Sequence, residues 1–286
     1  MRVLLSLLLL LLLFAQPVFA AGCDSDTRFL NHFDCANGDS DAPDENCDGS
    51  GAHSITWGGD AQCSTAEKKF ITGASLLLDG SDYLRATAST DFELFASNTG
   101  VTSVDFWAFN TDRTDYGEQG MINQYFDTSN FWMIRYNGEL NGIIFYNRVS
   151  GSAACNTGYQ SSFVDNSWHH FAGIKNGTDV GLYKDGTQIG YCSNTSTASR
   201  SGRLDVGYQQ GSYYTGGMDE IRIQHSDYFS ANPNSTPNDS IPVPTVAYSA
   251  AVVEGRRIIV ITKFTPLEEG GYERHVEQHW YTNKDT

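Results

Sequence analysis

Runs of helix-forming residues are scarce in this chain of 286 residues. Beyond the first twenty residues, Ala, Leu, Glu and Lys nowhere build a long stretch at helical spacing. Instead, 28 glycines, 15 tyrosines and 16 phenylalanines are spread among many Ser, Thr, Asn and Asp residues. Aromatic and β-branched residues favour strands, and glycine is typical of turns. The composition therefore excludes a helical bundle and indicates an all-β protein.

Positive charge is also scarce. Lys and Arg total 18 against 34 Asp and Glu, so the net charge is −16 at pH 7. Such a surface repels nucleic acids and anionic membranes, and we expect neither as a partner. After residue 20 no apolar run approaches the ~18 residues that a membrane span needs, so we expect no membrane insertion.

The first twenty residues resemble a secretory signal. Arg2 supplies a positive start, Leu4 to Phe14 form a leucine-rich core, and Ala20 offers a small residue before the cleavage point. We therefore expect residues 1–20 to be removed and the protein to be secreted, extracellular or held at the cell surface. An alternative interpretation treats residues 20–23 as a degenerate lipobox, in which Cys23 would carry a lipid anchor.

Catalytic motifs are missing. The chain contains no G-x-S-x-G, H-E-x-x-H or P-loop pattern. A retaining glycosidase needs two carboxylates about 5–5.5 Å apart, which calls for acids at alternate strand positions. Asp91 and Glu93 begin such a pattern, but Ala96 stands where its last acid belongs. Asp219 and Glu220 are adjacent and would point to opposite faces of a strand. We therefore do not expect an enzyme.

The six cysteines have no C-x-x-C spacing, which argues against structural zinc. An even number behind a secretory signal favours disulfides, although six cysteines allow fifteen pairings. We expect Cys155 to pair with Cys192, because they flank one predicted hairpin. Cys35 and Cys47 bracket a short acidic loop that their pairing would close. Cys23 would then pair with Cys63, unless Cys23 is lipidated. Four N-x-S/T sequons, which either accept glycans or occur by chance, lie at Asn176, Asn194, Asn234 and Asn238.

Strand signals run through most of the chain. Between Trp168 and Ile223, apolar and polar residues alternate, and Asn-Gly and Asp-Gly pairs at residues 176–177 and 185–186 interrupt them. These pairs are strong signals for type I′ hairpin turns. Residues 101–110 form another strand, and we expect Val104, Phe106 and Ala108 to face the core. Strands at intervals of about 8–12 residues predict a sandwich or barrel.

The ordered motifs resemble the laminin-G-like, concanavalin A-like lectin/glucanase jelly rolls. They lie at Phe29–Gly38, Asp48–Phe70, Gly73–Leu84, Val104–Phe109, Trp168–Gly173, Leu182–Gly186 and Gly217–Ile223. The resemblance implies an antiparallel two-sheet β-sandwich. We assign residues 22–230 to this domain and residues 231–286 to an extended tail with one or two further strands. The cysteines at positions 35 and 63 depart from the family pattern, as does the chain after residue 246.

Calcium is the candidate metal. Asp44, Asn46 and Asp48 have the opening spacing of a calcium loop, but Ile55 stands where an EF-hand needs Glu. The resemblance adds Asp34 and Asp219, because the first and last strands of the fold are usually neighbours, and it also supports Asp48. The pair at residues 169–170 is a weaker metal candidate, because adjacent strand residues face opposite ways.

Aromatic residues suggest the function. Tyr208, Tyr213 and Tyr214 lie in a Gly/Gln/Ser-rich loop, and exposed rings can stack on the apolar faces of sugars. We therefore expect a non-catalytic module that binds glycans or surface glycoproteins, or mediates adhesion, with calcium ordering its loops. One alternative is a structural subunit of a surface layer, filament or virion that self-associates through the C-terminal tail. A second alternative is a glycoside hydrolase.

Overall fold

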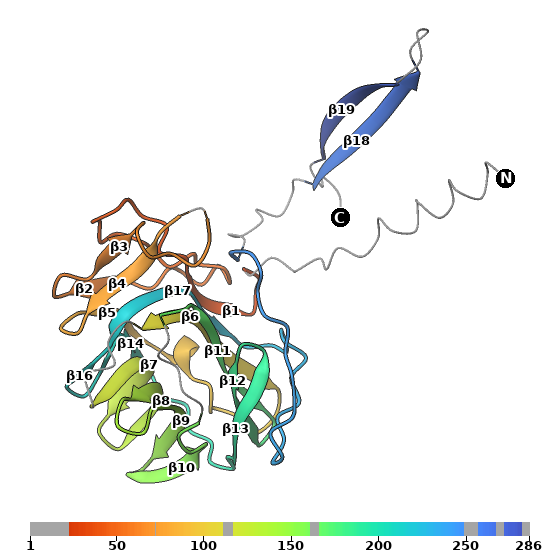
Figure 1. The fold of residues 1–286 in the computed structure, drawn as a ribbon. Coiled ribbons are helices and arrows are strands. Elements are labelled where there is room, and N and C mark those ends of the chain that lie inside the picture. Colours follow the sequence, from red (N-terminus) through yellow and green to blue (C-terminus); the bar gives the residue numbers. More distant parts are fainter. Residues whose placement is uncertain are drawn as a thin grey trace. The chain divides into compact units, whose positions relative to one another are not determined.

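The computed structural model describes residues 23–71, 73–110, 117–160, 166–248, 257–266 and 272–281. The predicted signal at residues 1–20 lies outside these residues. Two antiparallel sheets pack face to face, which confirms the predicted sandwich (Figure 1). Among the described residues, no helix is long and apolar enough to cross a membrane.

The larger sheet has eight strands. Seven of them follow one another in the spatial order β13 (Thr187–Ser193), β12 (Asp179–Lys184), β11 (His169–Asn176), β6 (Val101–Asn110), β17 (Thr215–Gln224), β4 (Ser75–Asp79) and β3 (Gln62–Ser64), so the long strands β6 and β17 lie near its centre. The eighth, β1 (Thr27–Asn31), also pairs with β17, so the first strand of the domain is a neighbour of its last, as expected.

The second sheet has seven strands and carries a short hairpin, β15–β16, beside β7. The hairpin strands are β15 (Tyr208–Gln209) and β16 (Ser212–Tyr213). The order of the sheet is β10 (Ser152–Asn156), β9 (Gly142–Val149), β8 (Asn130–Asn137), β7 (Glu118–Asp127), β14 (Gly202–Val206), β5 (Tyr83–Ser89) and β2 (Ile55–Gly58). One 3₁₀ turn, η2 (Thr90–Phe92), follows β5.

The core lies between the sheets and is built by alternation along the strands. Val104, Phe106 and Ala108 of β6 are fully buried in it, as predicted, and face Trp132 and Phe145 in the same cluster. The β12–β13 turn is also as predicted, because both its loop residues, at 185–186, have positive φ. The β11–β12 turn differs: residue 176 pairs with residue 179, so residues 177–178 form the loop.

A C-terminal strap, residues 226–248, covers the outer face of the eight-stranded sheet along β11 to β13 (Figure 1). Phe229, Ala231 and Ile241 pack on Ala172 and Tyr183 of that face. The backbone N–H of Ile241 also donates to the carbonyl of residue 186. The strap accordingly belongs to the same compact unit as the sandwich. The domain boundary at residue 230 stays a prediction. The second unit contains one hairpin, β18 (Arg257–Pro266) with β19 (Tyr272–Tyr281).

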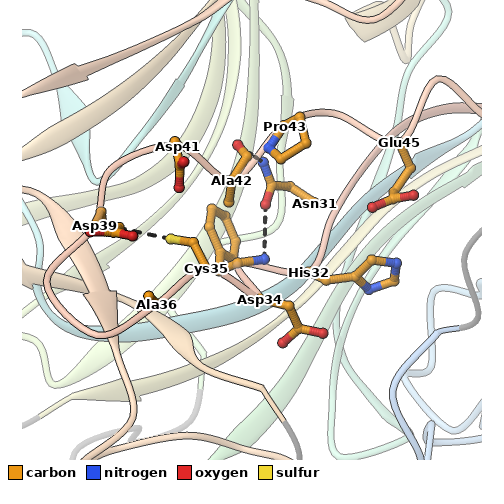
Figure 2. A pocket seen from close by; sticks show the side chains of 11 residues that line it. Asn31, His32, Asp34, Cys35, Ala36, Asp39, Asp41, Ala42, Pro43 and Glu45 are labelled. Carbon is orange, nitrogen blue, oxygen red and sulfur yellow. Dashed lines mark hydrogen bonds between the residues drawn. The ribbon is translucent and has the colours of Figure 1, made fainter.

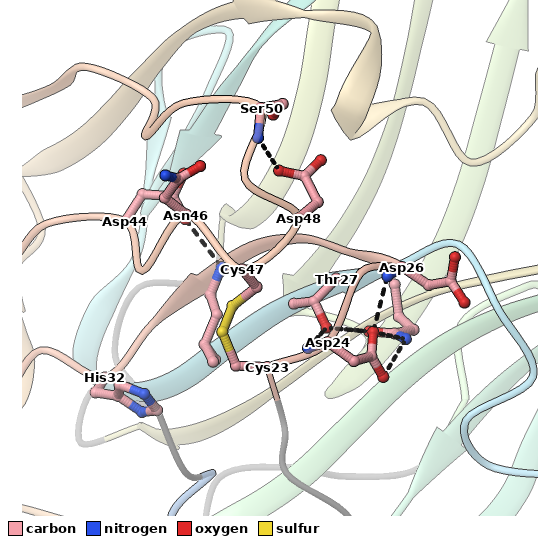
Figure 3. Close-up of a disulfide and its surroundings, with 12 residues drawn as sticks. Cys23, Asp24, Asp26, Thr27, His32, Asp44, Asn46, Cys47, Asp48 and Ser50 are labelled. Atoms are coloured by element: carbon pink, nitrogen blue, oxygen red, sulfur yellow. Dashed lines mark hydrogen bonds between the residues drawn. A yellow bond between two sulfur atoms is a disulfide. The ribbon is translucent and has the colours of Figure 1, made fainter. Parts of the chain in front are cut away.

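Three disulfides are present, and two of them differ from our expectation. Cys155 pairs with Cys192 as expected, and joins the edge strand β10 of one sheet to the edge strand β13 of the other. The expected pairs Cys35–Cys47 and Cys23–Cys63 are wrong, because the structure contains Cys35–Cys63 and Cys23–Cys47. Figure 3 shows the second of these bonds. Cys23 therefore has no free thiol for the lipid anchor considered from sequence.

The path of the chain around β1 explains the actual pairing. After residue 42 the chain returns alongside β1, with Glu45 N–H donating to the carbonyl of Leu30 and Arg28 contacting Asp48. This return brings Cys47 back to the start of β1, where Cys23 lies. Cys35 lies past the other end of β1, beyond Phe33, whose φ is 55°, and there it meets β3 and Cys63.

Candidate functional site

The outer face of the seven-stranded sheet carries rings and guanidinium groups. Alternation places the neighbours of core residues Trp132, Ile134 and Phe145 on this face. Between the β15–β16 hairpin and strands β8–β9 lies a cavity of about 300 Å³, which we call the β8–β9 groove. Its lining residues are Glu118, Phe131, Met133, Arg135, Tyr146, Arg148, Gln209, Gln210 and Ser212.

The β8–β9 groove has an aromatic and apolar floor. The centroids of the rings of Phe131 and Tyr146 lie 6.0 Å apart. Met133 of β8, which also lines the groove, is buried. Gln210 is exposed and Tyr146 is half-buried, so polar groups and part of one ring remain accessible to a ligand. The lining is mainly polar, with charged, amide and hydroxyl groups around a smaller apolar floor.

The hairpin that forms one wall is held rigidly. A Cβ on Gly120 of β7 would lie 2.4 Å from Cβ of Gln209, so the hairpin can pack closely only because this residue is glycine. The side-chain amide of Asn123 also donates to the carbonyl of Tyr208 at 2.6 Å. The wall of the groove is therefore fixed to β7 before any ligand arrives.

The three tyrosines expected to bind a ligand separate in the structure. Tyr208 and Tyr213 are half-buried and paired on the hairpin, with ring centroids 4.9 Å apart. Tyr83 of β5 lies 5.7 Å from Tyr208, which extends the row of rings. Tyr214 is fully buried in the core, so the expectation that it is exposed is wrong: alternation turns its ring inward.

The acidic loop predicted to bind calcium has its oxygens engaged by protein donors (Figure 3). Asp44 accepts from Leu30 N–H and from the backbone and ring of His53, and Asn46 accepts from Gly51 N–H. Asp48 accepts from Ser50 N–H and pairs with Arg28 at 2.7 Å. Among the described residues, no group of three or more His, Cys, Asp or Glu is arranged to hold a metal ion.

Asp34 and Asp219 are the remaining calcium candidates. Asp219 is buried and accepts from the backbone N–H groups of Lys69 and Glu220 at 3.2 and 2.9 Å. Burial raises the pKa of Asp219 well above its ordinary value, and the charges of Glu220 and Asp34 raise it further. Carboxylate oxygens in such a repulsive setting fit the ligand preference of calcium, which stays a prediction for this pair.

An acidic pocket of about 330 Å³ lies next to Asp34. Figure 2 shows Asp34, Asp39, Asp41 and Glu45 distributed around it. His32, on the same wall, places its Nδ1 2.9 Å from the carboxylate of Glu220, which does not line the pocket. The lining of this pocket carries negative charge, whereas the β8–β9 groove is lined by the tilted ring pair of Phe131 and Tyr146.

An apolar cavity of about 550 Å³ lies over Trp107 beside the strap. Lys69 covers the ring of Trp107, and its Nζ lies 3.6 Å from the ring centroid. Burial lowers the pKa of Lys69, against the opposing charges of Asp185 and Asp219. Because the ammonium occupies a face of the indole, that face of Trp107 is not open for a sugar to stack on.

The adjacent histidines His169 and His170 each pair with a carboxylate. His169 contacts Asp185 at 2.6 Å, whereas the buried His170 contacts Asp105 at 3.2 Å, so the two rings face different partners, as alternation predicts.

Asn194 is fully buried and its amide donates to the carbonyl of Ser196, which leaves no room for a glycan. Asn238 is exposed.

His53 makes the acidic loop pH-dependent. Its Nδ1 lies 2.7 Å from Asp44 and its Nε2 3.1 Å from Asp91. Burial disfavours the imidazolium, but the two carboxylates outweigh it and raise the pKa of His53 above 6.5. Its stabilising contribution is thus complete below pH 6.5 and is lost as the pH rises through the raised pKa. We expect the unfolding free energy to fall by of order 1 kcal/mol across that window.

The measurement is urea unfolding at pH 6 and pH 9 of the protein and of His53→Gln. The variant should be less stable at pH 6 and should show a smaller loss between the two pH values. An equal pH dependence in both proteins would contradict the assignment to His53.

With the geometry described, the chain can be compared with known proteins. A family model described as the concanavalin A-like lectin/glucanases superfamily matches residues 78–229. This chain is a member of that superfamily. The match includes most of both sheets and the whole β8–β9 groove. A comparison with curated protein sequences found no match.

Several solved structures with a similar fold are binding domains. The binding domain of botulinum neurotoxin serotype D has a TM-score of 0.55 at 12% identity, over 91% of this chain and 64% of that one. Domain 4 of an extracellular GH43 arabinanase from Geobacillus stearothermophilus, solved with arabinotriose, has a TM-score of 0.51 at 16% identity, over 70% and 93%. The binding domain of botulinum neurotoxin DC, solved with SialylT, has a TM-score of 0.50 at 12% identity, over 70% and 48%. At these identities the likeness concerns the fold alone.

Proposed function

We propose that this protein is a carbohydrate-recognition module that binds glycans in the β8–β9 groove. The observation that carries the proposal is the groove itself, with the rings of Phe131 and Tyr146 on its floor and amide, hydroxyl and guanidinium groups on its walls. Rings bind the apolar C–H faces of a sugar, while the polar groups receive its hydroxyls. The arabinanase domain was solved with arabinotriose, and the binding domain of botulinum neurotoxin DC was solved with SialylT. These two complexes support carbohydrate recognition over the other candidate functions.

Secretion belongs to the same proposal. Three disulfides close loops in a chain that begins with a secretory pattern, and disulfides persist in oxidising compartments. A module of this kind would meet glycans or glycoproteins outside the cell or at its surface, and would serve attachment or adhesion.

A glycan array probed with the purified protein, with and without a calcium chelator, tests the proposal. We expect binding to a restricted set of glycans. If calcium at Asp34 and Asp219 orders the N-terminal loop, the chelator should lower the melting temperature and reduce binding. Binding unchanged by the chelator would contradict the calcium prediction alone, whereas no binding in either condition would contradict carbohydrate recognition.

A further inference from the structure

Four arginines gather on the outer face of the seven-stranded sheet, although the chain has only 18 Lys and Arg and a net charge of −16. Each stands next to a fully buried strand position, so alternation directs it outward. They are Arg85 on β5, Arg203 on β14, Arg135 on β8 and Arg148 on β9.

These arginines outnumber the acids that pair with them. Arg85 and Arg203 share one carboxylate, that of Asp205, at 2.5 and 2.9 Å. Arg135 pairs with Glu118 at the groove. For Arg148, the contact within the described residues is a neutral one, from Nε to the carbonyl of Gly151 at 3.0 Å. Four guanidinium groups therefore meet two carboxylates, and the face keeps a positive charge.

Two of the arginines line the β8–β9 groove and retain donors for a ligand. Nε of Arg135 is buried and, among the described residues, has no hydrogen-bond partner. Arg148 donates its Nε–H to the backbone carbonyl of Gly151, and its side chain lines the groove. A buried donor without a partner is costly, so a ligand oxygen there would be strongly favoured.

We infer that the glycan bound in the groove carries an anionic group, a carboxylate or a sulfate, that is held by Arg148 and Arg135. The inference rests on the proposed glycan-binding function and adds the class of sugar. Guanidinium groups match the planar, two-oxygen geometry of such anions and form stronger hydrogen bonds with them than with hydroxyls. The half-buried ring of Tyr146 then contacts the sugar ring, and the arginines select its charge.

The test uses pairs of glycans on the array that differ only in the acidic group: a uronic acid oligosaccharide with its carboxyl-reduced form, and a sulfated oligosaccharide with its desulfated form. We expect the acidic member of at least one pair to bind about ten- to a hundredfold more tightly than its neutral counterpart. The pair that shows this difference distinguishes carboxylate from sulfate. Raising the salt concentration should weaken the acidic member more.

Arg148→Gln should remove most of this preference, because it should weaken binding of the acidic member much more than binding of the neutral member. Lys68→Gln, which makes the same change in net charge beside the other sheet, is the control and should change neither. Equal binding of acidic and neutral members would overturn the inference while leaving carbohydrate recognition intact. A preference that survives in Arg148→Gln would also overturn it. Failure of every glycan to bind would instead refute the proposed function.

Discussion

Replacing Asp105 with leucine is expected to lower the free energy of unfolding by about 3–5 kcal/mol. Asp105 is fully buried and contacts Arg222 Nε at 3.0 Å, His170 Nε2 at 3.2 Å and the hydroxyl of Tyr248 in the strap. Burial disfavours its charge, but Arg222, His170 and Tyr248 outweigh this and lower the pKa of Asp105. Without the carboxylate, the guanidinium of Arg222 remains buried with no counter-charge.

A double replacement separates charge from packing. Asp105→Leu with Arg222→Met removes both charges and leaves apolar side chains beneath the rings of Tyr228 and Tyr248, which lie 3.6 and 4.0 Å from the guanidinium carbon of Arg222. In urea unfolding, the double variant should regain at least half of the lost stability. A double variant as unstable as the single one would show that the uncompensated charge is not the cause.

Removal of the Cys155–Cys192 bond is the second large effect. The bond closes a loop with a sequence separation of 37 residues and joins the edges of the two sheets. Closing a loop of this length restricts the unfolded chain by about 4 kcal/mol. We therefore expect Cys155→Ala with Cys192→Ala to lose about 2–4 kcal/mol in urea unfolding. Dithiothreitol should destabilise this variant less than the native protein, because one bond fewer remains to be reduced.

The matched comparison is Cys23→Ala with Cys47→Ala, which opens a loop with a separation of 24 residues next to β1. This pair holds the N-terminal loop without bridging the sheets, and its loss should leave the Cys155–Cys192 contribution unchanged. A loss below about 1 kcal/mol on removing Cys155–Cys192 would contradict the role assigned to that bond.

The strands and the inward face of β6 could be predicted, because alternation and turn residues are local signals. The burial of the outward face of β6 could not be predicted from these local signals. Asp105 and Trp107 lie on it and are buried nevertheless, because residues more than 120 positions later form the strap that covers them. The disulfides around β1 were mispredicted for a similar reason: their pairing depends on the return of the chain along β1.

The β8–β9 groove also escaped the sequence analysis. Along β8, Phe131, Met133 and Arg135 alternate with Trp132, Ile134 and Tyr136, so both faces contain aromatic and apolar residues. The pattern shows a strand but does not show which face is inside. The signal that could have indicated the groove is the single arginine on the outward set of β8 together with Tyr146 and Arg148 on β9, because guanidinium groups rarely lie in a core.

The most direct test of the account is a calorimetric titration of the glycan that binds most tightly on the array. The protein, Tyr146→Ala in the β8–β9 groove, and Glu45→Gln in the acidic pocket are compared. Loss of a central ring from a binding site costs about 2 kcal/mol or more, or roughly thirtyfold in affinity. We predict this loss for Tyr146→Ala and a change within about twofold for Glu45→Gln. Full affinity in Tyr146→Ala, or a comparable loss in Glu45→Gln, would contradict binding in the groove.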